Sequence, residues 1–253
     1  MGRNGLQRDR HPGGATGGAV TPRQRILVLD VGGSHVKLLA TGHRTPIKVP
    51  SGPTLTPGQM VAAVRRATAH WHFDVVSIGY PAPVQQGHPV AEPQHLGPGW
   101  VGFDFAAAFD CPVRLINDAA MQALGGYRGG RMLFLGLGTG LGSALIIEGH
   151  LQPLELAHLP YRKGKTFEEY VGEEGRLRLG PQKWRRRVID VVERLHAAMQ
   201  VHHTLLGGGN ARFFRRHVTE FPVGTRIGSN ADAIRGGMRL WRAPEELARL
   251  AGG

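Results

Sequence analysis

The sequence predicts an α/β fold of two similar lobes, and two glycine-containing stretches carry this prediction. Ile26 to Ala40 holds two apolar runs on either side of Gly32-Gly33, which is the composition of a tight β-hairpin. The stretch from Arg131 to Ile147 repeats the pattern, with a glycine-rich turn that carries a hydroxyl. Neither stretch is a P-loop or a Rossmann fingerprint, because no Gly-Lys-Ser/Thr follows and each turn leads into another strand pattern. The recurrence indicates two halves that face each other across a cleft for a nucleotide or phosphate.

The first turn has the residue types of an anion site. Asp30 ends the first apolar run, where a carboxylate is costly unless it faces a cation or a polar cleft. Gly32 and Gly33 lack a Cβ, so their N–H groups can converge on an anion, while Ser34 adds a hydroxyl and Lys37 a positive charge. We interpret the turn as a phosphate cradle with a carboxylate that organises Mg²⁺. The alternative is an ordinary hairpin with a polar turn.

The segment between the hairpins predicts alternating strands and helices. Thr56-Pro57 is typical of an N-cap followed by a first-turn proline, and apolar residues then recur at helical spacing to about His70. Asn117-Asp118 follows a strand pattern and precedes a helix pattern, so Asp118 either caps that helix or faces a cleft. The other expected elements are a strand near 47–49, a buried strand over 74–81, a substrate-side loop over 82–100, a short helix over 104–109, a strand over 113–116 and a helix over 119–124.

After the second hairpin the sequence predicts mostly helices. Glu155 and His158 place a carboxylate and an imidazole three residues apart, a pair that more often forms an ordinary hydrogen bond than a site. Gly207 to Asn210 is a further turn that exposes backbone, and we expect a helix from Ala211. The other expected elements are a capping-box helix from Thr166, a long helix from 182 to about 202, a strand over 204–206 and a closing helix over 230–241.

Length and composition exclude several classes of protein. A chain of 253 residues can form one large domain or two of about 100 to 130 residues. Residues 1–24 are rich in Arg, Gly and Pro without an apolar core, and no apolar run approaches the length of a membrane span. We therefore expect a cytoplasmic protein with a disordered leader and no membrane partner. Cys111 is the only cysteine, which excludes an internal disulfide and a thiolate metal cluster within the chain.

The formal net charge of +12 favours anionic partners. The charge concentrates in the leader, between Arg162 and Arg187, and between Arg212 and Arg216, without interleaved aromatics or zinc-finger spacing. We expect no specific nucleic-acid partner, and a generally basic solvated surface is the plainer interpretation. One group of basic residues nevertheless favours polyphosphate as a ligand: Arg162, Lys163, Lys165, Lys183, Arg185, Arg186 and Arg187. We call these seven residues the basic stripe.

Five motifs, taken together and in order, resemble the ROK family of sugar kinases, most of all its polyphosphate glucokinase-like branch. They are Asp30-Val-Gly-Gly-Ser34, Asn117-Asp118, Leu137-Gly-Thr-Gly-Leu-Gly142, Glu155-Leu-Ala-His158 and Gly207-Gly-Gly-Asn210. The resemblance covers residues 25 to 241. It implies a two-lobed actin-like ATPase fold of RNase H-like topology with the active site in the interlobe cleft. It also implies an N-terminal lobe over 25–118 and a C-terminal lobe over 119–253, whose final helix packs back on the N-terminal lobe.

The resemblance implies a role for each matching residue. Asp118 would be the general base, and Asn117, Glu155 and His158 would bind sugar hydroxyls. Asp30 would organise Mg²⁺ through water. The donor-binding residues would be Asp30, Gly32, Gly33, Ser34, Lys37, Gly138, Thr139, Gly140, Gly142, Gly208, Gly209 and Asn210. Phosphoryl transfer requires such positioned anions, a cation and a placed carboxylate.

The implied function is transfer of a phosphoryl group from ATP or inorganic polyphosphate to the 6-hydroxyl of a hexose. A catalytically weak sugar-binding sensor on the same fold is the alternative, and a homodimer is an open possibility. Residues 162–174 contain no cysteine, so the structural zinc common in the family should be absent. Ser34 stands where Thr is usual, and Ala82 and Ala157 replace glycines, which leaves the sugar open.

Overall fold

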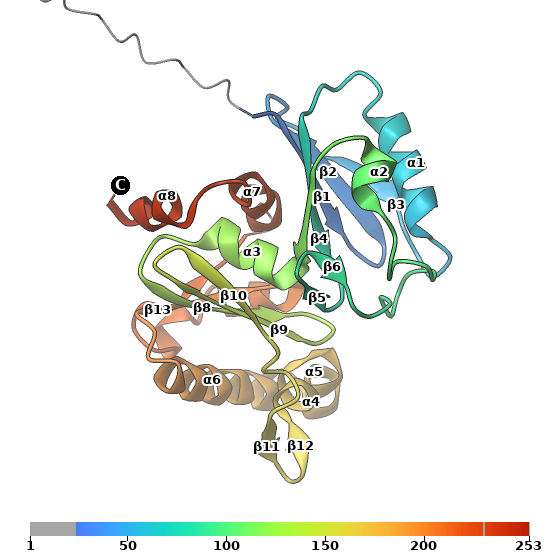
Figure 1. Ribbon diagram of the computed structural model, residues 1–253. Coiled ribbons are helices and arrows are strands. Elements are labelled where there is room, and N and C mark those ends of the chain that lie inside the picture. Colours follow the sequence, from blue (N-terminus) through green and yellow to red (C-terminus); the bar gives the residue numbers. More distant parts are fainter. Residues whose placement is uncertain (1–23, 230, 253) are drawn as a thin grey trace, which may run out of the picture.

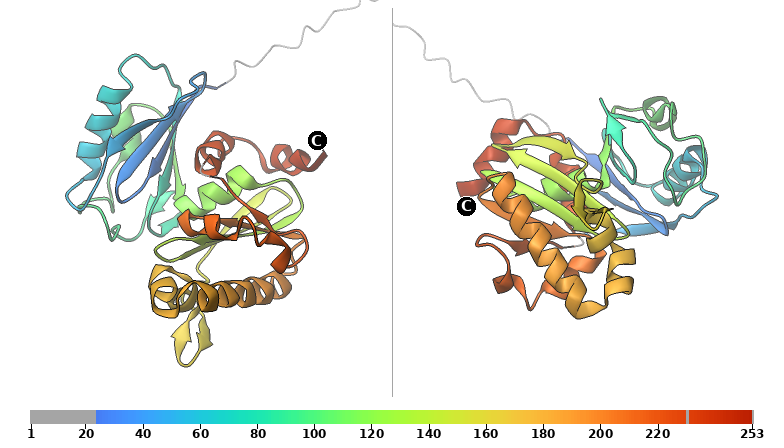
Figure 2. Two further views of the ribbon diagram at one scale, coloured as in Figure 1. Left: turned by 180° about the vertical axis from the view of Figure 1, so that it is seen from behind. Right: turned by 90° about the horizontal axis from the view of Figure 1, so that it is seen from below.

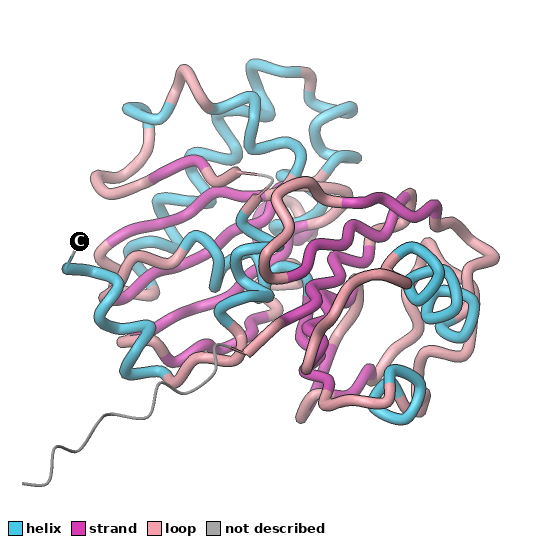
Figure 3. The backbone as a smooth tube through the Cα atoms, turned by 90° about the horizontal axis from the view of Figure 1, so that it is seen from above, coloured by secondary structure: helices cyan, strands magenta, loops and turns pink. Residues whose placement is uncertain are grey.

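The computed structural model describes residues 24–229 and 231–252, and it contains two five-stranded sheets set at an angle to each other (Figure 1). Residues 1–23 of the expected leader and residue 230 lie outside the described part of the chain. In the view from above, the strands of the two sheets form two separate layers with helices around them (Figure 3). No helix of the described residues is long and apolar enough to cross a membrane.

The N-terminal sheet has the strand order β3-β2-β1-β4-β7. Its strands are β1 (Ile26–Val31), β2 (His35–Ala40), β3 (Ile47–Pro50), β4 (Val75–Tyr80) and β7 (Val113–Asn117). The first hairpin is confirmed, since β1 and β2 pair antiparallel, whereas β1, β4 and β7 run parallel. Helices α1 (Pro57–Ala67) and α2 (Phe105–Phe109) cover the outer face and bury Met60, Tyr80 and Trp100 with the strands.

Helix α1 begins as predicted and ends early. Thr56 accepts from the Gln59 N–H and completes a capping box, so the N-terminal signal is confirmed. The helix stops at Ala67, three residues before the expected end, and the Thr68 hydroxyl donates to the Val64 carbonyl at 2.9 Å. A threonine that bonds backbone in this way competes with the helix and favours its termination. The loop over 82–100 contains a small hairpin that we did not predict, β5 (Val84–Gln85) with β6 (His88–Pro89).

The C-terminal sheet has the strand order β10-β9-β8-β13-β14. Its strands are β8 (Arg131–Leu137), β9 (Leu141–Ile147), β10 (His150–Leu154), β13 (His203–Gly207) and β14 (Arg226–Ile227). The second hairpin is confirmed as β8 with β9, and β13 runs parallel to β8. Helices α4 (Phe167–Val171), α5 (Glu173–Leu179) and α6 (Pro181–Ala198) lie under one face, while α3 (Asp118–Gly126) covers the other (Figures 1 and 2).

Helix α7 (Asp232–Arg239) joins the two halves. It comes after the C-terminal sheet in the chain, yet it packs on β1 and β4 of the N-terminal sheet. The buried Ser77 hydroxyl of β4 donates to the Gly237 carbonyl at 2.7 Å, and the Trp241 indole donates to Ser77 at 2.9 Å. α7 also crosses α3 so closely that a Cβ on Gly236 would lie 1.7 Å from the Met121 carbonyl oxygen. α7 therefore meets α3 through backbone contact and meets the N-terminal sheet through apolar side chains and the Ser77 hydroxyl.

Several C-terminal expectations are wrong in detail. The long helix α6 ends at Ala198, because Gln200 takes a left-handed φ of 49° before β13 begins. The helix expected from Ala211 is a 3₁₀ helix, η1 (Gly209–Phe214), and α7 is followed by α8 (Pro244–Ala248) and η3 (Arg249–Gly252). We did not predict β10, α5, the hairpin of β11 (Pro160–Arg162) with β12 (Lys165–Thr166), β14 or the 3₁₀ helix η2 (Val218–Glu220). Most of these elements are too short or too polar for a periodic signal.

Candidate active site

Parallel strands of the two sheets deliver the motifs to one region. β1 ends beside Asp30, β7 ends at Asn117, and β13 ends at Gly207. In open α/β sheets, ligands bind beyond the carboxyl ends of parallel strands. Asp30 lies opposite Lys37 in the β1–β2 ladder, and the Lys37 ammonium contacts the Asp30 Oδ2 at 3.0 Å. The Asp30 side chain is 12% exposed, so its charge is partly withdrawn from water and balanced by Lys37.

Asp118 is not the cap of α3. Asn117 takes that position, and its Oδ1 accepts from the N–H groups of Ala119 at 2.9 Å and Ala120 at 3.4 Å. Asp118 is the first helical residue, and its Oδ1 accepts only from the Ala119 N–H, at 2.7 Å. Desolvation, and then the nearby charge of Asp30, raise the pKa of Asp118 to about 7. The residue keeps some exposure, so the carboxyl is withdrawn from bulk water without being sealed off.

A cavity of about 360 Å³ lies between the two halves. One wall is formed by Asp30 and Lys37 of the N-terminal sheet, and the rest comes from elements after α3 begins. Its lining residues are Asp30, Lys37, Gln122, Gly207, Gly208, Gly209, Ala211, Arg212, Arg215, Gly228, Ser229 and Ala233. Four predicted donor-binding residues thus share one cavity: Asp30, Lys37, Gly208 and Gly209. Sequence reasoning missed Gln122, Arg212, Arg215 and Ser229, although the charge concentration at 212–216 was a signal for the two arginines.

The second glycine turn is tied to the third. Asn210 donates from Nδ2 to the Gly138 carbonyl at 3.4 Å and to the Glu173 Oε2 at 2.8 Å. A Cβ on Gly208, which has a φ of +76°, would lie 2.3 Å from the Leu137 carbonyl oxygen. The two turns can therefore approach this closely only because Gly208 has no side chain. The Asn210 amide serves this junction, and its contact with a donor stays a prediction.

The anion capacity of the second turn is partly used by the protein itself. The Leu141 N–H donates to the Glu168 Oε2 at 3.0 Å, and the Gly138 N–H donates to the Gly140 carbonyl at 3.1 Å. The N–H groups of Thr139 and Gly140 have no acceptor among the described residues. On the far side of the turn, a Cβ at Gly142 would lie 2.7 Å from the Ala119 Cβ, so this glycine lets the turn approach the start of α3.

The first glycine turn meets the loop after β4. The Gly32 N–H donates to the His35 carbonyl at 3.1 Å, and the Ser51 hydroxyl donates to the Gly32 carbonyl. A Cβ on Gly33 would lie 3.0 Å from the His95 Cβ, which places the loop over 82–100 against this turn. Ser34 is exposed. His95 is thus a neighbour of the turn, in the loop that we expected on the substrate side.

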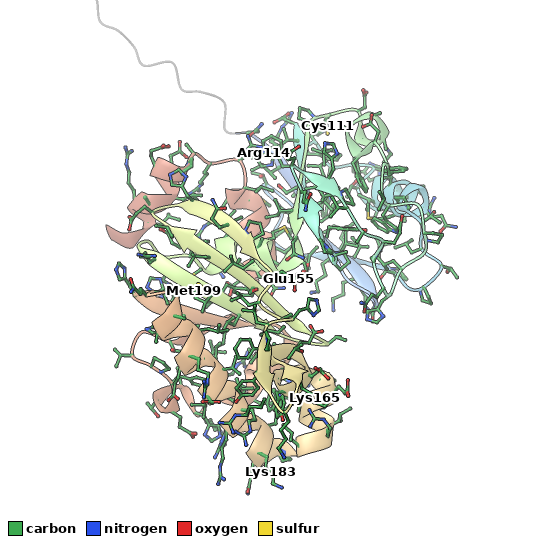
Figure 4. The ribbon with its side chains drawn as sticks, turned by 60° about the horizontal axis from the view of Figure 1, so that its bottom comes forward. Cys111, Arg114, Glu155, Lys165, Lys183 and Met199 are labelled. Carbon is green, nitrogen blue, oxygen red and sulfur yellow. The ribbon has the colours of Figure 1, made fainter. Side chains whose placement is uncertain are left out.

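Glu155 and His158 pair with each other. Their Oε1 and Nε2 atoms are 3.8 Å apart, and their side chains are 63% and 71% exposed. Figure 4 shows Glu155 in the region where the two lobes face each other. Asn117 donates from Nδ2 to the Ala82 carbonyl at 3.3 Å, so both ends of its amide are engaged. Neither Glu155 nor His158 forms a contact with Asp118, and their roles in sugar binding stay predictions.

The donor set at Asp30 fits Mg²⁺ bound in company with a phosphorylated substrate. No group of three or more His, Cys, Asp or Glu side chains within the described ranges could hold a metal alone. Mg²⁺ commonly uses one or two carboxylates, water and substrate phosphates instead. Asp118 does not line the cavity that Asp30 lines, but it lies near enough for the charge of Asp30, after desolvation, to raise its pKa. A Mg²⁺ ion near Asp30 would be attracted by these negative charges.

A family comparison decides the classification. The model of the ROK family matches residues 27–153, which is half of the chain. The chain belongs to the ROK family. The matched region of this ROK chain runs from β1 through β10 and so includes both glycine hairpins and Asn117-Asp118. No curated protein sequence matches it.

Solved structures support the same classification at the level of fold. The ROK chain resembles the inorganic polyphosphate/ATP-glucomannokinase of Arthrobacter sp. strain KM with a TM-score of 0.71 and 22% identity, over 89% of this chain and 99% of that one. A ROK family glucokinase from Streptomyces griseus, solved with glucose and AMPPNP, gives a TM-score of 0.63 and 16% identity, over 89% of this chain and 99% of that one. The ROK hexokinase of Thermus thermophilus gives a TM-score of 0.61 and 19% identity, over 85% of this chain and 97% of that one. The chain therefore has the two-lobed actin-like ATPase fold.

Proposed function

We propose that this protein is a sugar kinase that transfers a phosphoryl group from ATP or inorganic polyphosphate to the 6-hydroxyl of a hexose. The observation that carries the proposal is Asp118, a carboxyl at the start of α3 that is withdrawn from bulk water and feels the charge of Asp30. A pKa of about 7 suits a group that must accept a proton near neutral pH. The solved relatives named as glucokinase, hexokinase and glucomannokinase support the same reaction class.

In the proposed mechanism, Asp118 accepts the proton of the attacking sugar hydroxyl while the donor phosphates lie along the glycine turns. Glu155 and His158 would hold sugar hydroxyls, and Asn117 would act by fixing the start of α3 and the backbone at Ala82. The free N–H groups of Thr139 and Gly140 would donate to donor phosphates, together with Lys37. When bound at Asp30, Mg²⁺ would neutralise charge on those phosphates. The lobes would be 25–118 and 119–253, with the boundary at Asp118.

The reaction class can be tested directly. We expect a coupled assay over a panel of hexoses and N-acetylated hexoses, with ATP and polyphosphate in parallel, to show sugar-dependent formation of a 6-phosphate. Asp118→Asn is the control for contaminating kinases, since it should abolish most turnover in the same preparation. Sugar binding with no turnover on any donor would instead support the sensor alternative.

The pH dependence follows from the raised pKa of Asp118. Only the ionised carboxylate can accept a proton, so kcat/KM should rise with pH up to about 7 and level off above it. Because the charge of Asp30 is one cause of the raised pKa, Asp30→Asn should move the limb to lower pH, whatever it does to the maximum rate. The measurement is a pH profile of kcat/KM for both proteins. If the acidic limb of the pH profile lies at the same pH in Asp30→Asn as in wild type, the charge of Asp30 does not raise the pKa of the catalytic group.

A further inference from the structure

Two arginines stand opposite Asp30 in the cavity between the lobes. Arg212 lies in η1 and Arg215 directly follows it, and both line the cavity. A 3₁₀ helix has three residues per turn, so side chains three apart lie on the same face. The Arg215 N–H donates to the Arg212 carbonyl at 3.5 Å, which continues that geometry to Arg215. Neither guanidinium forms an ion pair within the described part of the chain, although the Glu173 carboxylate, which pairs with Arg176, lies near enough for the charge of Arg212 to lower its pKa.

The cavity lacks the groups that usually hold a nucleobase. Small-molecule pockets are mostly lined by apolar and aromatic side chains with a few polar groups. Here the lining contains glycines, two alanines, Gln122 and Ser229 beside the charged residues, and no aromatic or large aliphatic side chain. Three cations, Lys37, Arg212 and Arg215, stand against the single carboxylate of Asp30. Guanidinium groups bind phosphate oxygens through paired N–H donors, so this lining suits a chain of phosphates.

Cationic side chains continue outside the cavity along η1. Phe213 is 43% exposed. The guanidinium carbons of Arg212 and Arg176 lie 4.9 Å and 5.4 Å from the centroid of its ring. A neighbouring cavity of about 200 Å³ is lined by Arg176, Arg185 and Phe213, among others. Both of these further guanidinium groups are paired with carboxylates, Arg176 with Glu173 at 2.5 Å and Arg185 with Glu220 at 3.6 Å. Of the cations that line the two cavities, those without an ion pair among the described residues are therefore Arg212 and Arg215 of the first cavity.

The basic stripe has a weaker claim. Its members Arg162, Lys165 and Arg185 lie 4.0, 2.7 and 3.6 Å from carboxylate oxygens of Asp190, Glu169 and Glu220, which offset their charge. Figure 4 shows Lys165 and Lys183 at the end of the C-terminal lobe that lies away from the N-terminal lobe. The cations that line the cavity are Lys37, Arg212 and Arg215, none of which belongs to the basic stripe.

We propose that Arg212 and Arg215 bind the donor phosphates beyond the transferred one, and that they select linear inorganic polyphosphate over a nucleotide. The inference rests on the proposed kinase function and names the donor of that site. In the transfer, the sugar oxygen bonds to the terminal phosphorus and its proton goes to Asp118. The bridging P–O bond breaks, and the shortened polyphosphate keeps the electron pair on its new terminal oxygen.

The test compares three single variants, Arg212→Gln, Arg215→Gln and Arg216→Gln. Arg216 is the matched control, because it is an exposed arginine of the same segment that does not line the cavity. Kinetics with tripolyphosphate, with longer polyphosphate fractions and with ATP should show KM for long polyphosphate raised about tenfold or more in the two cavity variants, since charge-assisted hydrogen bonds are lost. Their kcat should change little, and Arg216→Gln should stay within about twofold of wild type.

Equilibrium binding of polyphosphate in the absence of sugar separates this inference from the proposed function. If the protein binds polyphosphate through Arg212 and Arg215 but phosphorylates no sugar, the kinase assignment fails and the anion site stands. The logarithm of the binding constant should also fall less steeply with salt in each cavity variant, by about 0.7 per lost phosphate contact. Equal losses in Arg216→Gln, equal affinity for a single-stranded RNA of similar charge, or KM changes confined to ATP would each overturn the proposal.

Discussion

Asp118→Asn should lower kcat by roughly 10²-fold or more while sugar affinity is kept, because an amide cannot take the proton of the attacking hydroxyl. The substitution preserves size, and the amide oxygen can still accept from the Ala119 N–H as Asp118 does at 2.7 Å. α3 should remain capped, since the capping oxygen belongs to Asn117. The measurements are kcat, sugar affinity and thermal stability on one variant. Near-wild-type turnover would remove Asp118 from the mechanism.

The same variant should be more stable than wild type at neutral pH. The folded-state pKa of Asp118 is about 7, above its ordinary value of 3.8, so the native state binds more protons than the unfolded state between these values. Stability of the wild type therefore falls as pH rises from about 4 to about 7 because of this group. Asn carries no such penalty, so its thermal advantage should be present at pH 8 and vanish near pH 4. A difference in Tm that does not depend on pH would mean that Asp118 does not titrate in this range.

The second large effect is expected at the crossing of α3 and α7. Gly236→Ala would place a Cβ only 1.7 Å from the Met121 carbonyl oxygen. This oxygen belongs to the backbone, so it cannot move to another rotamer as a side-chain atom can. The helices must separate, and overpacking of this kind costs about 1–3 kcal/mol or more. Because α7 also packs on β1 and β4, the damage should spread to both lobes. Thermal unfolding should show a Tm lower by several degrees.

Gly58→Ala is the matched control for that experiment. Gly58 also lies in a helix, α1, but it is exposed and an added Cβ would meet nothing within 4 Å. Alanine favours helix by about 1 kcal/mol over glycine, so this variant should be neutral or slightly stabilised. If both substitutions behave alike, the close contact at Gly236 does not limit stability.

The predictable parts of the molecule were those with local signals. Both glycine hairpins, the N-cap at Thr56, the capping box at Thr166 and the buried face of α6 follow from period and capping chemistry. Errors appeared where a single residue ended an element, as Gln200 does with its left-handed backbone. They also appeared in strands of two or three residues, such as β14, which exist because a neighbouring strand offers its edge.

The candidate site was predictable in its glycines and acids but less so in how they are used. The sequence allowed Asp118 to be either the N-cap of α3 or a cleft residue. In the structure Asn117 is the N-cap, so Asp118 is not. Asn210 seemed available to a donor, yet its amide joins Gly138 to Glu173. Arg212 and Arg215 share a face only because η1 has three residues per turn. Such roles come from contacts between distant segments, which no local pattern contains.

The position of α7 has a consequence for the order in which the protein forms during synthesis. The strands of the N-terminal sheet leave the ribosome before the C-terminal sheet, but Val28 and Ser77 are covered by a helix that follows this second sheet in the chain. Until Asp232 to Trp241 emerges, the nascent N-terminal lobe presents an apolar sheet face and a hydroxyl without its acceptor. Exposed surface of this kind invites aggregation and chaperone binding. The N-terminal lobe can therefore complete its packing only after all strands of the C-terminal sheet have been synthesised.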